Sequence, residues 1–284
     1  ATGIIGLGLI GGSIAKALHQ AGEIVFGSDS NEASVTQAVA EGIILPQTDW
    51  RMWIHQVDQI VIATPLEIVS KQVQALAQEK VDHRITVVDV SSVKAAIADA
   101  YAALPASFEP LLLHPMAGRE RQGYSASCKD LFQGFPCAVV PLAGRLPQPR
   151  RVAWWMQKLG MHPVYLSLER HDWQVAQLSH VPYLVAAALL VALPVDTPDF
   201  GQLAGSGIKD TTRVGGSRFS LWEAILKANH QPVAASFHVF AQKIAQWDHA
   251  LQQGELPGDL HQAESVYHAL MQAMKENKEI THEN

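Results

Sequence analysis

Three glycines near the start of the chain have the spacing of a phosphate-binding turn. Gly6, Gly8 and Gly11 follow an apolar stretch and open a segment whose pattern predicts a helix. Glycine at these positions permits a tight turn, a close approach of the backbone to a pyrophosphate, and close packing of helix on strand. The predicted helix, from about Ser13 through Leu18, would present N–H groups to the phosphates, and Leu9 and Ile10 are further candidate cofactor contacts. The pattern predicts a dinucleotide site; the alternative is a glycine-rich turn without a ligand.

An acid follows the next apolar stretch and bears on the choice of dinucleotide. The stretch from Glu23 to Ser28 ends at Asp29, close to the spacing of about 20 residues at which a carboxylate contacts the adenosine ribose. Such an acid accepts hydrogen bonds from NAD and repels the 2′-phosphate of NADP. Ser28, Ser30 and Asn31 supply small donors that could hold that phosphate if Asp29 points away.

A histidine and two serines end neighbouring apolar stretches. His114 has a near-neutral unperturbed pKa, which suits removal of a proton from a hydroxyl; the alternative is a histidine bonded to a loop carbonyl. Ser92, beside Ser91, could bind the substrate hydroxyl or orient the histidine, or could cap a helix. Thr64 and Pro65 could line a nicotinamide site, or could form a turn.

Two cations lie four residues apart in the second half of the chain. Lys209 and Arg213 would share one face of a helix, and Arg213 could bind a substrate carboxylate through two hydrogen bonds. The alternative is a solvated basic face. Trp222 could form a wall against a ring-shaped substrate, although a helical tryptophan more often belongs to a core.

Strands and helices alternate through residue 167 and only helices follow, which predicts two domains. Residues 1–167 would form a doubly wound, parallel Rossmann-type sheet, and residues 168–284 a helical domain. The predicted strands are 2–5, 23–28, 58–63, 86–90, 111–113, 137–141 and 162–166, and the predicted late helices are 169–193, about 199–207, 219–228, 231–253 and 261–277. The 169–193 segment is apolar on every face in its second half, so we expect it to be buried, in a core and at a dimer interface.

Composition excludes several classes of partner. Of 284 residues, 48% are hydrophobic and the formal net charge is −6, so a nucleic-acid partner is not expected. No uninterrupted apolar run reaches the ~20 residues that span a bilayer. The two cysteines and the spacing of the histidines predict neither a disulfide framework nor a metal site. No signal peptide is visible, so a cytoplasmic location is expected.

The ordered set of motifs resembles the prephenate/arogenate dehydrogenase family of tyrosine synthesis over nearly the whole chain. The motifs are the glycine turn, Ala63-Thr64-Pro65, Asp89-Val90-Ser91-Ser92-Val93-Lys94, His114 to Glu120, Ser179-His180-Val181-Pro182 and Lys209 to Arg213. The resemblance implies a Rossmann domain followed by a helical dimerisation domain, and therefore a homodimer. It also implies oxidative decarboxylation of a cyclohexadienol with hydride transfer to a nicotinamide cofactor.

The resemblance assigns roles to individual positions. His114 matches the catalytic histidine, Ser92 the assisting serine and Arg213 the arginine that holds the ring carboxylate. Glu120 matches an acid at the mouth of the active site. Further positions match positions in or near the substrate pocket: Lys209, Asp172, His180 and Trp222. Tyr183 is a further candidate for substrate binding.

One departure bears on the substrate. Members that act on prephenate often carry a second histidine where this chain has Tyr183. The absence of that histidine favours arogenate as the substrate. Arogenate-type members commonly use NADP, so the resemblance favours NADP against the simple reading of Asp29. Two other readings remain: a β-hydroxyacid-type dehydrogenase with Lys209 as its catalytic lysine, and a dinucleotide-sensing protein without turnover.

Overall fold

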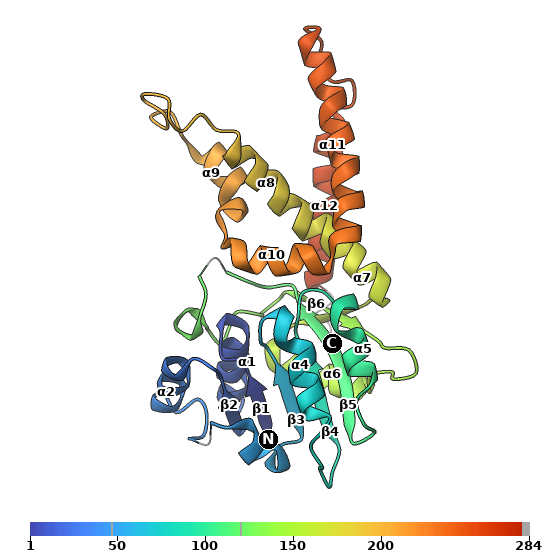
Figure 1. The fold of residues 1–284 in the computed structure, drawn as a ribbon. Helices are drawn as coiled ribbons and strands as arrows, with labels where there is room; N and C mark the ends of the chain where they lie inside the picture. Colours follow the sequence, from blue (N-terminus) through green and yellow to red (C-terminus); the bar gives the residue numbers. More distant parts are fainter. Residues whose placement is uncertain (47, 120, 280–284) are drawn as a thin grey trace. The chain divides into compact units, whose positions relative to one another are not determined.

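The chain folds into two compact units. The computed structural model describes residues 1–46, 48–119 and 121–279. The first unit comprises Ala1–His171 with the chain from Glu264 onward, and the second comprises Asp172–Ala263. Figure 1 shows the elements of each unit in sequence colours.

A seven-stranded sheet forms the centre of the first unit. Its order is β2-β1-β3-β4-β5-β6-β7, which places β1 between β2 and β3. The strands are β1 Thr2–Ile5, β2 Val25–Ser28, β3 Gln59–Ile62, β4 Ile85–Asp89, β5 Phe108–Pro115, β6 Pro136–Val140 and β7 His162–Tyr165. The predicted Rossmann-type sheet and all seven predicted strands are confirmed.

The expectation of a wholly parallel sheet is wrong at one edge. β6 pairs antiparallel with β5, with His114 opposite Ala138, and β7 is parallel to β6. A parallel neighbour requires a crossover, usually through a helix. The connection from β5 to β6 contains only the short helix η2 (Tyr124–Ala126) among its described residues, so the chain turns back at the same edge.

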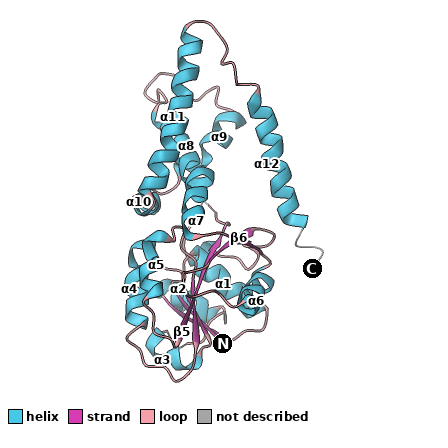
Figure 2. Ribbon diagram, turned by 90° about the vertical axis from the view of Figure 1, so that its right-hand side faces the viewer, coloured by secondary structure: helices cyan, strands magenta, loops and turns pink. Residues whose placement is uncertain are grey.

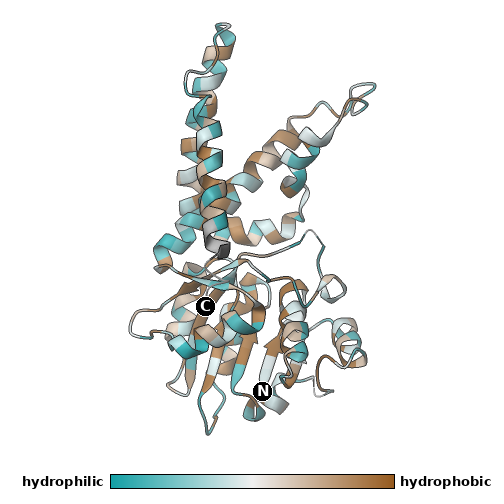
Figure 3. Cartoon of the chain, turned by 180° about the vertical axis from the view of Figure 1, so that it is seen from behind, coloured by the Kyte–Doolittle hydropathy of each residue, from teal (hydrophilic) through white to brown (hydrophobic). Residues whose placement is uncertain are grey.

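Helices cover both faces of the sheet (Figure 2). α1, α2 and α6 pack on the face that carries Ile4, Val61 and Leu111. α3, α4 and α5 pack on the face that carries Ile5 and Leu112. The helices are α1 Leu9–Gln20, α2 Glu32–Ala40, α3 Trp50–Trp53, η1 Ile54–Gln56, α4 Leu66–Leu76, α5 Ala95–Ala102 and α6 Pro149–Leu159. The strands β1, β3 and β4 are therefore buried on both faces, as their apolar sequences require, and the strands are mostly brown in Figure 3.

The described residues from 168 to 279 form helices and turns. The elements are α7 Leu168–Val175, η3 Ala176–His180, α8 Val181–Val191, α9 Ser206–Thr212, η4 Arg213–Gly216, α10 Phe219–Ala228, α11 His230–Gln252 and α12 Gln262–Glu279. α7 and α12 each cross a boundary between the two units. η3 is a π turn that joins α7 to α8.

The predicted helix at 199–207 is wrong. Asp199 and Gly201 have φ angles of 63° and 86°, in the left-handed region that right-handed helices exclude. α9 therefore begins only at Ser206. It is followed by η4, which packs on α8 so closely that a Cβ on Gly215 would overlap the backbone at Ala186.

The expected burial of the 169–193 helix in a core is met only in part by the single chain, and burial of the rest at a dimer interface stays a prediction. Val181, Tyr183 and Ala186 face inward, but Leu189 is 38% exposed and Val191 is 88% exposed. The continuous helix Leu168–Val191 contains an 18-residue window with a mean hydropathy of 1.4, so it is long and apolar enough to span a membrane, contrary to the sequence-based expectation. Core helices of soluble proteins can have the same length and composition.

Candidate active site

The glycine turn lies where the strand order reverses, between β1 and β3. Gly6 has a φ of +98°, and a Cβ there would overlap the backbone of Ala63. A Cβ on Gly11 would meet the carbonyl oxygen of Gly6, whereas a Cβ on Gly8 would have nothing within 4 Å. The turn thus needs two of its glycines for its own packing and leaves open space at the third. Ligands of such sheets bind at this reversal point.

Asp29 points toward the glycine turn. Its Oδ2 accepts a hydrogen bond from the backbone N–H of Leu7 at 2.5 Å, and its Oδ1 accepts one from Asn31 at 2.7 Å. The side chain of Asn31 caps α2 by accepting from Ala33 at 3.1 Å, while Ser30 is exposed. The alternative in which Ser28, Ser30 and Asn31 hold a 2′-phosphate required Asp29 to point away, whereas its carboxylate faces the turn.

A buried hydroxyl without a partner lies at the same edge of the sheet. Thr64 follows β3, and its Oγ1 has no hydrogen-bond partner among the described residues. An unpaired buried hydroxyl costs about 1–3 kcal/mol, which a polar atom of a ligand would offset. Pro65 precedes α4 and is exposed. The open space at Gly8 and the unpaired hydroxyl fit the dinucleotide that the glycine spacing predicts.

A buried ion pair joins the ends of β4 and β5. Lys94 and Asp89 are both inaccessible to solvent, and the Lys94 ammonium donates to the carboxylate of Asp89. It also donates to the carbonyl oxygens of Ser91 at 2.8 Å and Leu113 at 2.6 Å. The Ser91 hydroxyl donates to Asp89 at 2.9 Å, so this hydroxyl belongs to the same network. Sequence reasoning did not assign a role to Lys94, although a lysine five residues after a strand-end acid is a recognisable signal.

His114 lies on β5, half-buried, on the same side of the strand as Leu112. Its Nδ1 is 2.9 Å from Nε2 of His171, with the two rings edge to face at 5.1 Å. His171 is fully buried on α7, one turn after Leu168, which packs on the core cluster of that face. Sequence reasoning missed His171, because the 57 residues that separate the two histidines leave no local signal.

Ser92 occupies the loop after β4, the strand that neighbours β5. It is half-buried and follows the residues that Lys94 fixes. Cys137, on β6 opposite Pro115, is fully buried, and burial raises the pKa of its thiol to about 12. Among the described residues no group of three histidine, cysteine or acidic side chains could hold a metal ion.

In the second unit, three predicted substrate-binding residues form one aromatic cluster. The rings of Tyr183 and Trp222 stack at 3.9 Å with an angle of 8°. His180, which is 2% exposed, meets Trp222 edge to face at 6.0 Å. Asn229 lies 3.3 Å from the Nδ1 of His180 and donates to the carbonyl oxygen of Asp172 at 2.8 Å. Sequence reasoning did not identify Asn229.

The two predicted cations belong to the same unit. Lys209 is exposed on α9, and Arg213 is exposed at the start of η4, which packs on α8, the helix that carries Tyr183. Glu120 lies outside the described residues. Because His114 and Arg213 belong to different units, their convergence on one substrate remains a prediction.

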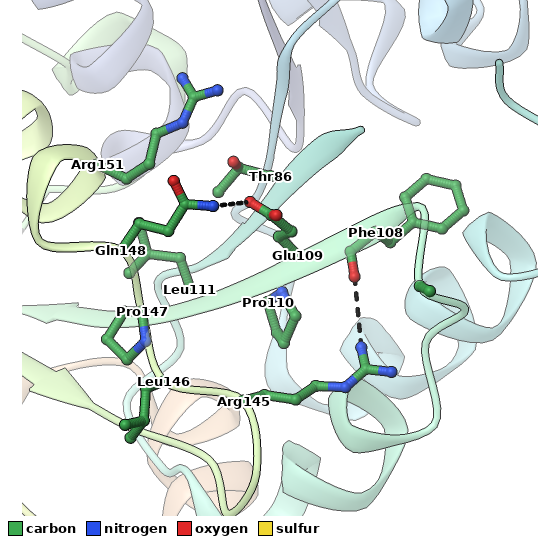
Figure 4. A pocket seen from close by; sticks show the side chains of 11 residues that line it. Thr86, Phe108, Glu109, Pro110, Leu111, Arg145, Leu146, Pro147, Gln148 and Arg151 are labelled. Carbon is green, nitrogen blue, oxygen red and sulfur yellow. Dashed lines mark hydrogen bonds between the residues drawn. The ribbon is translucent and has the colours of Figure 1, made fainter. Parts of the chain in front are cut away.

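A cavity of about 250 Å³ lies at the other end of β4 and β5 (Figure 4). Thr86 and Glu109 line it, and Gln148 donates to Glu109 at 2.8 Å. Arg145 donates to the carbonyl oxygen of Phe108 at 3.3 Å. Thr86, Phe108 and Glu109 lie at the amino-terminal ends of β4 and β5. Asp89 and His114 lie at the carboxyl-terminal ends of these strands, so the cavity does not belong to the candidate active site.

Comparison with protein families gives two matches that together cover most of the chain. Residues 14–152 match the nucleotide-binding domain of prephenate dehydrogenase, and residues 167–279 match its dimerization domain. The glycine turn itself precedes the first matched residue.

Curated relatives and solved structures agree with these matches. The chain is 29% identical over 251 residues to prephenate dehydrogenase of Bacillus subtilis, covering 85% of this chain and 67% of that protein. It is 27% identical over 235 residues to cyclohexadienyl dehydrogenase of Zymomonas mobilis, covering 80% of each. The match to the Lactococcus lactis prephenate dehydrogenase covers 64% of that protein, so the chain spans about two thirds of some relatives.

Two solved structures cover almost the whole chain. A. aeolicus prephenate dehydrogenase, in complex with hydroxyphenyl propionate and NAD+, has a TM-score of 0.80 at 26% identity and covers 96% of this chain and 97% of its own. Synechocystis arogenate dehydrogenase has a TM-score of 0.71 at 26% identity and covers 98% of both chains.

Proposed function

The chain belongs to the prephenate dehydrogenase family, and from that premise we propose that it catalyses the oxidative decarboxylation of a cyclohexadienol carboxylate with a nicotinamide dinucleotide. The observation that carries the proposal is the placement of His114. This histidine lies near the end of β5, and its Nδ1 contacts His171. β5 belongs to the same sheet as β1 and β3, and the glycine turn lies where the strand order reverses between those two strands.

The dinucleotide site is proposed from the residues around the turn. Gly6, Gly8, Gly11 and the first residues of α1 would hold the pyrophosphate, because the helix start offers N–H groups and positive dipole there. The Thr64 hydroxyl would find its missing partner on the bound cofactor. When bound, the nicotinamide supplies the acceptor for the substrate hydride.

His114 acts as the base in this proposal. It accepts the proton of the substrate hydroxyl at Nε2 as the carbon that bears the hydroxyl loses hydride. The resulting dienone withdraws the electron pair of the carbon–carboxylate bond, so carbon dioxide leaves and the ring becomes aromatic. His114 can then return the proton to the phenolate oxygen. Ser92, in the neighbouring loop, would donate a hydrogen bond to the same oxygen.

The second unit supplies the proposed substrate contacts. Arg213, with Lys209 on the preceding turn, would bind a substrate carboxylate, since a guanidinium matches a carboxylate in a bidentate pair. The stacked Tyr183 and Trp222 would form an apolar wall for the ring. His180 would border the same wall.

Two finer features follow from particular side chains. Tyr183, where prephenate-specific members often have a histidine, supports arogenate as the preferred substrate. Asp29, which faces the glycine turn, supports NAD over NADP, because its carboxylate would repel a 2′-phosphate. The dimerization-domain match supports a homodimer.

The test is a steady-state assay of arogenate and prephenate, each with NAD and with NADP. We expect the highest kcat/KM with arogenate and NAD. Turnover with NADP alone would contradict the role of Asp29, and a preference for prephenate would contradict that of Tyr183.

Replacing His114 tests the chemistry itself. His114→Asn removes the base, so kcat should fall by about 10²–10⁴-fold while cofactor binding persists. Unchanged turnover would refute the catalytic role. If Lys209→Met instead abolished kcat with KM unchanged, the β-hydroxyacid-type reaction would be favoured. Cofactor binding without any turnover would favour a dinucleotide-sensing protein.

A further inference from the structure

The contact between His114 and His171 constrains where both rings carry their protons. Their nitrogens are 2.9 Å apart, which is hydrogen-bond distance, and a hydrogen bond between two imidazoles requires a proton on one nitrogen and a lone pair on the other. Two arrangements are therefore possible. Either His114 donates from Nδ1, or His171 donates from Nε2.

Only the first arrangement leaves His114 able to act as a base. If His171 donated, a neutral His114 would carry its own proton on Nε2, and that nitrogen could not accept another. If His114 donates from Nδ1, its Nε2 has a lone pair, and His171 must carry its proton on Nδ1.

We propose that His171 is the positioning residue of the reaction, which holds His114 in the tautomer with the proton on Nδ1 and the lone pair on Nε2. This inference rests on the proposed function. After His114 accepts the substrate proton, its Nδ1–H bond to His171 becomes charge-assisted and therefore stronger. His171 keeps its own proton throughout, so it orients and stabilises the base without relaying a proton.

The fold keeps His171 in place for this task. The residue is fully buried, and its backbone N–H donates to the carbonyl oxygen of Ser167 at 2.9 Å in the first turn of α7. Leu168, three residues earlier on the same face of the helix, packs against the sheet cluster beneath β5. A buried ring on a packed helix loses little further freedom on binding substrate, which is what a positioning group requires.

Two substitutions separate positioning from other roles. His171→Gln places an amide oxygen near the position of the imidazole Nε2. This oxygen can accept the hydrogen bond from Nδ1–H of His114, but the amide cannot relay a proton. His171→Leu cannot accept at all. We expect kcat to fall about 100-fold in His171→Leu, with KM for both substrates within about threefold, and to recover to within about tenfold of wild type in His171→Gln.

His162→Leu is the matched control, because it removes another buried histidine of the same unit outside the site. We expect its kcat to equal that of the wild type. Equal losses in the Gln and Leu variants would overturn the proposal in favour of a proton relay or of packing, and unchanged kcat in both would overturn it outright.

A direct measurement keeps the proposal testable even if a variant does not fold. Nitrogen NMR of the wild-type protein labelled at histidine distinguishes a protonated from an unprotonated ring nitrogen. We expect His114 to carry its proton on Nδ1 at neutral pH, and a proton on Nε2 would overturn the proposal. His114→Asn assigns the signal, and its turnover separately tests the proposed function.

Discussion

At the scale of single residues, the glycine turn offers a matched pair of substitutions. A methyl group on Gly8 would enter open space, whereas one on Gly11 would meet the carbonyl oxygen of Gly6. The space beside Gly8 is therefore available to a ligand, whereas Gly11 is required by the packing of the turn.

We predict opposite outcomes for Gly8→Ala and Gly11→Ala. Gly8→Ala should leave the melting temperature unchanged and weaken dinucleotide binding by about tenfold, since the methyl group occupies the path of the pyrophosphate. Gly11→Ala should lower the free energy of unfolding by about 1–3 kcal/mol through overpacking. Thermal unfolding and cofactor titration measure both effects. A Gly8→Ala variant that binds normally would mean that the phosphates lie elsewhere.

His162 gives a pH-dependent prediction. It is 6% exposed, neither ring nitrogen has a hydrogen-bond partner among the described residues, and burial lowers its pKa. Between that lowered value and the unfolded-state pKa of about 6.5, the unfolded chain binds more protons than the folded chain. Above about pH 6.5 the imidazole is neutral in both states and its titration does not affect stability. As the pH falls below that value, the free energy of unfolding decreases.

His162→Leu should remove this loss. The slope of unfolding free energy against pH should decrease by up to about 1.4 kcal/mol per pH unit below pH 6.5, where the wild-type imidazole would have to be protonated. Urea unfolding between pH 5 and pH 8 measures the slope, with exposed His19→Leu as a comparison. Parallel curves for wild type and His162→Leu would show that the buried imidazole does not titrate on unfolding.

At the scale of elements, the Lys94–Asp89 pair determines how β4 and β5 end. The ammonium reaches one carboxylate and two backbone carbonyl oxygens, one of which belongs to the residue before His114. The pair thus holds together the loop that carries Ser91 and the end of β5 that carries His114.

Lys94→Met should lower the free energy of unfolding by about 3–5 kcal/mol, because it leaves the buried carboxylate of Asp89 charged without its cationic partner. The double variant Lys94→Met with Asp89→Leu should recover much of that loss, since no buried charge remains. Lys227→Met, which breaks an exposed pair with Glu223, is the control and should cost about 0.5 kcal/mol or less. Equal costs for Lys94→Met and Lys227→Met would contradict this account.

The sequence predicts the elements better than their pairing. Each strand is a short apolar run between helices, and periodicity alone locates it. The reversal of β6 depends on the connection after β5, whose polar residues contain no signal of direction. The same limit applies to the candidate site. Local motifs suggest His114 and Arg213, whereas His171 and Asn229 contact side chains 57 and 49 residues away, which no local pattern predicts.

At the scale of the whole molecule, the exposed apolar residues of α8 bear on assembly. Leu189 and Val191 lie on the helix that the sequence marks as apolar all round, in the region that matches a dimerization domain. Apolar side chains at this density are typical of a surface that a second subunit covers.

We predict a homodimer with about twice the 30.9 kDa mass of one chain. Leu189→Glu with Val191→Glu should shift the mass toward the monomer, because each carboxylate would lose its solvation in the interface. Light scattering coupled to size exclusion measures the mass. Leu146→Glu, at a 79% exposed leucine of the first unit, is the control and should remain dimeric. A dimer that survives the α8 substitutions would place the interface on other helices.

The π turn of η3 has a consequence for how related chains are compared. Such a turn is a helix with one residue inserted, and one residue corresponds to about 100° around a helix axis. Deleting a single codon between Ala176 and His180 would leave every side chain of α8 intact while turning Tyr183 and its neighbours to another side. A gapless alignment of this chain with a relative that lacks the insertion would therefore equate residues that face different directions.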